Sequence, residues 1–362
     1  MTIHWTLKRD CEVLHKTNVK RVERIALPII LVLTILVGQA AGSQKSPSWQ
    51  DPSKHQVKIV TVEDGVRLEV LDWGGFGRPV VLLAGSGCTA HIYDDFAPKL
   101  TGFCHVYGIT RRGFGASSQP ASGYEDQRLA DDILQVLASL HISKPVLVGH
   151  SMAGGEMTTI GNQHSDQLSG LVYLDALGDP RDWTGSDPAY IELAKNLPAA
   201  MWKPPPSEVE QRSFEAYRSW QMRNGEGVFP ESELRNTHLS NTDGTMGRYK
   251  TPPGIHKAIG DSQIKRDYSQ IRVPVLAFLE FPRSIDDPLR QSEYKPKDER
   301  ERAAIEAFNK ATMAYVERWI KNLKSGVPDA RLVDLPGAGH YVFLTRESDV
   351  LRELRSFLGG LH

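Results

Sequence analysis

Cysteine is scarce in this sequence, with 3 residues among 362. The three positions, Cys11, Cys88 and Cys104, include no CxxC pair and no Cys/His cluster with the spacing of a metal site. The cysteines therefore indicate no metal site, and the candidate residues described below require neither a metal ion nor an organic cofactor. Cys88 and Cys104 are expected to be partly buried thiols, with a single disulfide bond between them as the alternative.

The sequence also lacks an excess of charge of one sign. It has 43 Lys and Arg against 44 Asp and Glu, a net charge of −1. No long basic tract follows the first turns of the chain, so nucleic acid is not an expected partner. A content of 40% hydrophobic and 24% charged residues is typical of globular proteins, which excludes disordered, collagen-like and polytopic membrane proteins.

Long apolar runs are absent except for residues 25–37 (IALPIILVLTILV). Residues 1–24 before this run carry a net charge of +3, and small residues follow it. This pattern predicts a signal peptide cleaved after Ala40 or Gly42, with an uncleaved membrane anchor over residues 25–42 as the alternative. We expect the remaining chain to be exported, secreted or periplasmic, and to contact a membrane only through this segment.

Short, nearly all-apolar runs bounded by glycine or polar residues are typical of strands buried on both faces of a parallel sheet. Six such runs occur, at residues 79–83, 105–109, 145–148, 171–174, 273–279 and 331–335. Two further runs, at residues 57–62 and 66–71, flank an Asp-Gly pair and predict a hairpin.

Helical spacing of apolar residues separates several of these strands, at residues 126–140, 302–323 and 349–358. Alternating strands and helices predict an α/β fold: a mostly parallel, eight-stranded sheet with helices on both faces.

The alternation is interrupted between residues 179 and 270, where proline and aromatic residues are frequent. A structureless loop of that length is not compatible with a compact domain, so we predict a largely helical cap. The resulting organisation is a leader, a linker, two parts of one core and the cap between them: residues 1–42, 43–55, 56–178, 271–362 and 179–270.

A serine surrounded by small residues follows the strand at 145–148, in the sequence Gly149-His150-Ser151-Met152-Ala153. Small neighbours suit a strained turn between a strand and a helix, where a larger Cβ would meet backbone. The helix that follows would place backbone N–H groups and the positive end of its dipole near the serine hydroxyl. The pattern predicts a nucleophile.

This turn resembles the G-x-S-x-G nucleophile elbow of the α/β-hydrolase family, with Ala153 at the second glycine. The resemblance extends from about residue 57 to residue 361. Residues 80–87 resemble the strand and loop that supply an oxyanion donor, with Ala84 where histidine is usual. The resemblance implies an oxyanion hole formed by the backbone N–H groups of Ser86 and Met152.

Two further loops resemble those of the family. Residues 110–117 resemble its D-x-R-G-x-G-x-S loop, with Thr110 in place of aspartate, and we expect a structural role in which Arg112 ties loops together. His340 follows Pro-Gly-Ala-Gly after the last predicted strand, as in the family's histidine loop, and is the expected general base. His91, near the expected oxyanion hole, is a candidate for lining the substrate pocket.

The acid that orients the histidine has several candidates. Asp175 stands at the carboxyl end of the strand at 171–174, one of the two places where the family puts this acid. Glu280, Asp286 and Asp287 follow the later strand and are the alternatives. Asp175 is the preferred candidate, and every choice keeps the chain order serine, acid, histidine.

Together these residues predict a serine hydrolase, with a carboxylic ester as the default substrate. The apolar, tryptophan-containing cap favours an ester-like small molecule with an apolar part. Lactonase, thioesterase, amidase and C–C hydrolase activities stay open. A protein of another class, which binds a ligand on this scaffold without turnover, is the alternative function.

Overall fold

The computed structural model describes residues 49–179, 187–201, 205–224, 227–280 and 294–361. The predicted signal peptide or anchor, together with the candidate acids Asp286 and Asp287, lies outside these described residues. Within them, no helix combines the length and the apolar character that a membrane crossing requires.

The centre of the protein is an eight-stranded sheet with the strand order β1-β2-β4-β3-β5-β6-β9-β10. β1 and β2 form an antiparallel hairpin, β2 is antiparallel to β4, and the remaining neighbours are parallel, which confirms the mostly parallel sheet. The strands are β1 (Gln56–Glu63), β2 (Val66–Gly75), β3 (Arg78–Leu83), β4 (Cys104–Ile109), β5 (Val146–His150), β6 (Gly170–Leu174), β9 (Val275–Leu279) and β10 (Arg331–Asp334).

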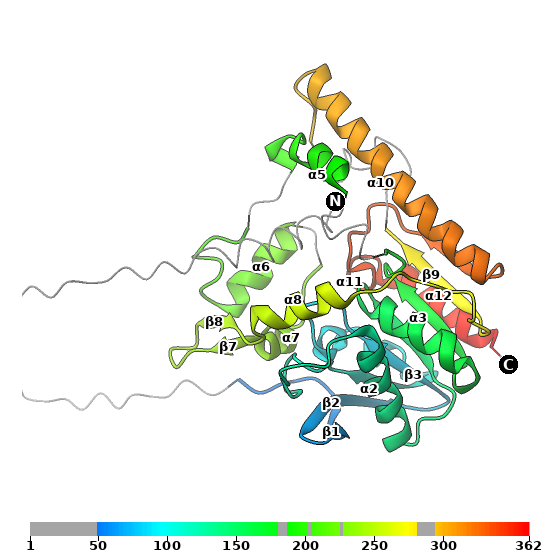
Figure 1. Cartoon of the computed structure of the whole chain (residues 1–362). Helices are drawn as coiled ribbons and strands as arrows, with labels where there is room; N and C mark the ends of the chain where they lie inside the picture. The colour runs from blue at the N-terminus through cyan, green and yellow to red at the C-terminus, as the bar shows by residue number, and fades with distance from the viewer. Residues whose placement is uncertain (1–48, 180–186, 202–204, 225–226, 281–293, 362) are drawn as a thin grey trace, which may run out of the picture.

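Helices cover both faces of this sheet (Figure 1). One face packs against α2 (Asp126–Ser139), α3 (Ala153–His164) and α10 (Glu299–Gly326), and the other against η1 (Ala90–Tyr93) and α12 (Glu347–Gly359). Strand β3 shows why: alternate residues point to opposite faces, so Val81 and Leu83 join one core and Val80 and Leu82 the other. The remaining short helices of the core are η2 (Ala97–Lys99), η3 (Ser165–Gln167) and α11 (Val342–Thr345).

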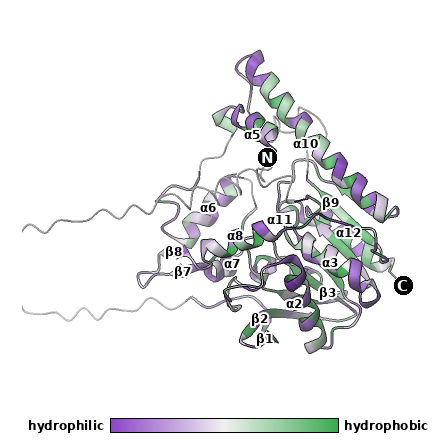
Figure 2. Cartoon of the chain, in the orientation of Figure 1, coloured by the Kyte–Doolittle hydropathy of each residue, from purple (hydrophilic) through white to green (hydrophobic). Residues whose placement is uncertain are grey.

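Hydrophobic residues gather in the central strands, whereas α10 alternates between hydrophobic and hydrophilic residues (Figure 2). The alternation reflects a helix with one buried face, as the spacing predicted for residues 302–323. The helix is longer than that prediction, and its first turn is capped by Asp298, whose side chain accepts the Glu301 N–H.

The insertion between β6 and β9 contains helices α5, α6, α7 and α8 and a short antiparallel pair, β7 and β8. The pair was not expected, although Asp243-Gly244 between its strands is a common hairpin signal. The elements are α5 (Pro188–Lys195), η4 (Ala199–Met201), α6 (Phe214–Asn224), α7 (Glu231–Thr237), β7 (His238–Ser240), β8 (Met246–Tyr249) and α8 (Pro253–Ser262).

The insertion packs against helix α10 on one side of the sheet and against the opposite core on the other. α5 lies along the N-terminal half of α10, where the Tyr190 hydroxyl is 3.0 Å from that of Thr312 (Figure 1). α6 and α7 pack on the other side of the sheet through buried Phe214, Trp220 and Leu234.

The loop after β4 has the expected structural role. The Arg112 guanidinium donates to both carboxylate oxygens of Asp132 on α2, at 2.6 and 2.7 Å, and lies 2.8 Å from the Glu63 carboxylate at the end of β1. The side chain is 1% exposed. It therefore ties a strand, a loop and a helix together.

The two cysteines of the described residues are buried and are not joined by a disulfide bond, which confirms the expected thiols. Burial raises the pKa of the Cys104 thiol to about 11. This thiol is therefore protonated at neutral pH.

The last residues of the expected linker, 49–55, already pack against the rest of the protein. Residues 49–55 have no regular secondary structure, but the Trp49 ring lies 4.9 Å from the Arg235 guanidinium of α7. The His55 side chain is 5% exposed and contacts Asp94 at the end of η1. These residues form an arm that lies against the core.

The close approach of α3 to the end of β6 gives a stability prediction. A Cβ on Gly154 would lie 2.1 Å from the Ala176 carbonyl oxygen, so Gly154→Ala must displace backbone and is expected to cost about 1 to 3 kcal/mol or more. Gly260→Ala is the matched control, because a Cβ there meets nothing within 4 Å, and it should stabilise α8 by up to about 1 kcal/mol. Denaturation midpoints of both variants check this, and a Gly154→Ala protein as stable as wild type would contradict it.

Candidate active site

Ser151 lies at the turn between β5 and α3, and its backbone has φ 54°, in the left-handed region. The packing around Gly149 explains the small residues of this motif. A Cβ on Gly149 would lie 2.8 Å from Met157 Sδ and 3.0 Å from the Ala153 Cβ. The Ser151 N–H donates to the Leu174 carbonyl of β6 at 3.2 Å, which anchors the turn to the next strand. The serine is half-buried and stays accessible.

Asp175 follows β6, and its backbone is also left-handed, with φ 48°. Its N–H donates to the Phe278 carbonyl of β9 at 3.0 Å. His340 comes from the loop after β10, and its Nδ1 donates to Asp175 Oδ2 at 2.6 Å. The two residues are 165 positions apart in the chain, and both are buried. When Nδ1 of a neutral imidazole carries the proton, Nε2 is free to accept one.

His150 connects the serine turn with the histidine loop. Its Nε2 donates to the His340 carbonyl oxygen at 3.0 Å, and the two imidazole rings are 4.5 Å apart between centroids. Complete burial, together with the charge of His340, lowers the pKa of His150 well below its usual value. A neutral His150 therefore joins the turn that carries Ser151 to the loop that carries His340. The sequence carried no signal for this bond, because it joins a side chain to a distant backbone group.

Glu280 lies at the end of β9, next to Asp175. Its backbone N–H donates to Asp175 Oδ1 at 3.4 Å, and its side chain is 1% exposed. Burial raises the pKa of Glu280 to about 7, and the negative charge of Asp175 acts in the same direction. Among the acids of the described residues, Asp175 is the one bonded to the His340 ring, and Glu280 contacts Asp175 through its backbone N–H.

The expected oxyanion donors, the backbone N–H groups of Ser86 and Met152, lie in two segments that contact each other. A Cβ on Gly85 would lie 2.7 Å from His150 Nδ1 and 3.0 Å from the Ser151 Cβ, so only glycine lets this loop approach the serine turn. Met152 stands just before α3, at the positive end of its dipole. Among the described residues, no acceptor is bonded to the N–H of Ser86 or of Met152.

The insertion reaches the same loop. Ile255 and Ile259 of α8 pack near Met152, and His256 Nδ1 is 3.4 Å from the Ser86 hydroxyl. The Tyr249 hydroxyl at the end of β8 donates to the Gly87 carbonyl. Side chains at the end of β8 and on α8 therefore contact the loop that carries Ser86 and the residue after Ser151.

His91 does not point toward this region as a pocket-lining residue would. It is buried, with Nδ1 3.0 Å from Asp94 Oδ2 and Nε2 3.5 Å from Glu69 Oε1. It belongs to a polar cluster between the arm, η1 and α7.

Comparison with known proteins shows the family and the fold. Residues 80–354, well over half of the chain, match the model of the "Alpha/beta hydrolase family". The chain belongs to this family. The E-2-(acetamidomethylene)succinate hydrolase structure has a TM-score of 0.60 at 17% identity and covers 84% of this chain and 100% of that one, which shows the alpha/beta hydrolase fold.

Relatives of this alpha/beta hydrolase carry several activity names. Non-heme chloroperoxidase CPO-A1 of Kitasatospora aureofaciens is 34% identical over 33% of this chain and 44% of its own length. The bifunctional esterase/perhydrolase DCH of Acinetobacter calcoaceticus is 30% identical over 36% and 48%. The chain thus spans less than half of these relatives. It spans 89% of the AB hydrolase superfamily protein YisY of Bacillus subtilis, at 26% identity over 66% of this chain. Together with the family, these names support hydrolase activity.

Glu280 gives a pH prediction for this alpha/beta hydrolase. Its pKa of about 7 in the folded state is above its value in the unfolded chain, so Glu280 binds more protons in the folded protein and its contribution to stability decreases as pH rises from about 4.5 to about 7. Glu280→Gln should remove a part of this loss, on the order of 2 kcal/mol. Urea denaturation of wild type and variant at pH 4.5 to 8 measures the difference, and identical pH profiles would contradict the raised pKa.

Proposed function

We propose that this protein is a serine hydrolase that cleaves a carboxylic ester through Ser151, His340 and Asp175. The hydrogen bond from His340 Nδ1 to Asp175 Oδ2 carries the proposal, because it leaves Nε2 as the ring atom able to take a proton. The turn that holds Ser151 and the bond from His150 to the His340 backbone support it.

The reaction follows from these roles. Ser151 Oγ attacks the acyl carbon while His340 Nε2 takes the hydroxyl proton, and the ester's alcohol leaves with that proton. Water then attacks the acyl-enzyme, giving the acid and free Ser151. The N–H groups of Ser86 and Met152 are the proposed donors to the oxyanion in both steps. Asp175 fixes the imidazole orientation and supports its positive charge.

The surroundings favour an ester with an apolar part. Ile255 and Ile259 lie near Met152, and Phe229 lies 4.8 Å from Tyr341, the neighbour of His340. Sites lined in this way bind apolar groups through burial of surface, with few polar contacts to fix orientation. The esterase name of one relative agrees with this class of substrate.

The nucleophile is tested by covalent labelling. A fluorophosphonate probe should label the wild-type protein, and Ser151→Ala and His340→Ala should remove the label, because the probe needs an activated serine. Circular dichroism shows whether each variant is folded. Absence of labelling in folded wild type would overturn the proposal and favour the ligand-binding alternative.

The acid is tested by comparing two neighbouring carboxyl groups. On p-nitrophenyl esters of increasing acyl length, Asp175→Asn should lower kcat by a factor of about 10⁴, because the wrong imidazole tautomer is then favoured. Glu280→Gln keeps the shape of the side chain and leaves the bond between Asp175 and the His340 ring in place, so its decrease should be far smaller. Equal losses in the two variants, or a larger loss in Glu280→Gln, would reassign the acid.

A further inference from the structure

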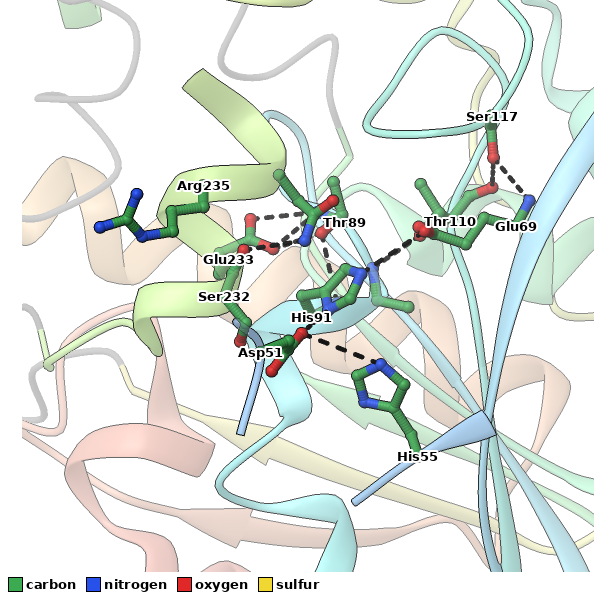
Figure 3. Close-up of polar contacts among 12 residues, drawn as sticks. Asp51, His55, Glu69, Thr89, His91, Thr110, Ser117, Ser232, Glu233 and Arg235 are labelled. Carbon is green, nitrogen blue, oxygen red and sulfur yellow. Dashed lines mark hydrogen bonds and ion pairs between the residues drawn. The ribbon is translucent and has the colours of Figure 1, made fainter. Parts of the chain in front are cut away.

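Outside the candidate active site, four side chains from two separate segments meet in a polar cluster. Asp51 and His55 come from the arm before β1, and His91 and Asp94 from η1 and the residue that ends it. One potential ligand atom from each lies within 4.8 Å of the other three. Figure 3 shows Asp51, His55 and His91 gathered beside Ser232 and Glu233 of α7.

The distances are close to those around a tetrahedral zinc ion. Zinc bonds of about 2.1 Å place donor atoms about 3.4 Å apart in a tetrahedron. Here His91 Nδ1 is 3.0 Å from Asp94 Oδ2 and 3.6 Å from Asp51 Oδ2, and His55 Nε2 is 4.0 Å from Asp51 Oδ2. All four atoms lie within 4.8 Å of one another, so the widest separation would have to shorten by at most about 1.4 Å to reach that spacing.

The groups behind these side chains orient them as metal ligands are usually oriented. His91 turns its other ring nitrogen, Nε2, toward Glu69 Oε1 at 3.5 Å, the carboxylate–histidine arrangement found behind many zinc ligands. The Thr110 hydroxyl holds that carboxylate from its far side at 2.7 Å.

Asp94 is held in the same way. Trp73 Nε1 donates to Asp94 Oδ1 at 3.2 Å, and the Ser232 hydroxyl of α7 donates to Oδ2 at 2.6 Å. Trp73 and Ser232 therefore help to fix this carboxylate from outside the cluster, in addition to its contacts with His55 and His91 inside it.

Burial and charge agree with a cation. The side chains of His55, His91 and Asp94 are 5%, 4% and 1% exposed, whereas that of Asp51 is 26% exposed and provides access from solvent. Asp51 and Asp94 would bring two negative charges to the ion, and Glu69 lies behind His91. Because Asp94 and Glu69 raise the pKa of His91 to about 10, a divalent ion would have to replace the proton on that imidazole.

We propose that Asp51, His55, His91 and Asp94 form a structural zinc site. Two imidazole nitrogens and two carboxylate oxygens are donors that Zn²⁺ accepts in a closed, four-coordinate site. The bound ion would join the arm to η1 and, through the bond from Ser232 to Asp94, to α7 of the insertion. This proposal is independent of the reaction proposed for Ser151.

The full-length protein, freed of metal by chelation and dialysis, is titrated with Zn²⁺ by calorimetry and with Co²⁺ by visible absorption. We expect one ion per chain, the intense absorption of four-coordinate Co²⁺ without a thiolate charge-transfer band, and a higher Tm with Zn²⁺. Asp51→Asn and His55→Gln should weaken binding by at least about tenfold, and Glu69→Gln by about tenfold.

Asp95→Asn is the matched control, an exposed aspartate next to Asp94 that should bind as wild type does. Asp51 lies in the arm outside regular structure and is partly exposed, so Asp51→Asn is expected to fold normally. Failure of the folded protein to bind Zn²⁺ and Co²⁺ would overturn the proposal. Binding that is unchanged in Asp51→Asn and His55→Gln would also overturn it, since the ion would then lie elsewhere.

Discussion

The candidate active site depends on a series of backbone hydrogen bonds along the carboxyl edge of the sheet. After three strands, the residue that follows the strand donates its N–H to the end of a neighbouring strand: Ser151 to Leu174, Asp175 to Phe278, and Leu335 to Leu279. These bonds hold two left-handed residues, Ser151 and Asp175, in a conformation that costs about 1 kcal/mol or more each without such support. Backbone bonds to the sheet therefore hold Ser151 and Asp175 in place, and the bond of Leu335 anchors the start of the loop that carries His340.

The insertion is attached to that edge through polar groups as well as apolar ones. The buried Glu233 carboxylate of α7 accepts the Thr89 N–H at 3.1 Å, and the Thr251 hydroxyl donates to the Gly113 carbonyl at 2.8 Å. Burial raises the pKa of Glu233 to about 7. Directional bonds of this kind fix how the insertion sits over the loop of Ser86, which apolar packing alone would leave less specific.

Local signals account for what could be predicted from the sequence. Local patterns of about ten residues define the buried strands, the turn at Ser151 and the loop of His340. The fold could therefore be predicted from the sequence, and Ser151 and His340 could be named as candidates. Asp175 could be preferred but not separated from Glu280, because the choice rests on a contact across 165 positions. The bond of His150 and the cluster around Asp94 join segments whose proximity appears only after folding. Residues 51–55 looked like linker because their partners lie elsewhere in the chain.

Helix α10 gives the molecule a mechanical property. Its 28 residues correspond to about 42 Å of one continuous rod, whose C-terminal half packs on the sheet while its N-terminal half lies against α5. A rod of that length acts as a lever arm: a tilt of about 5° at the sheet would carry its far end by roughly 4 Å. A displacement of α10 at the sheet would therefore also displace α5, because both pack against the same helix.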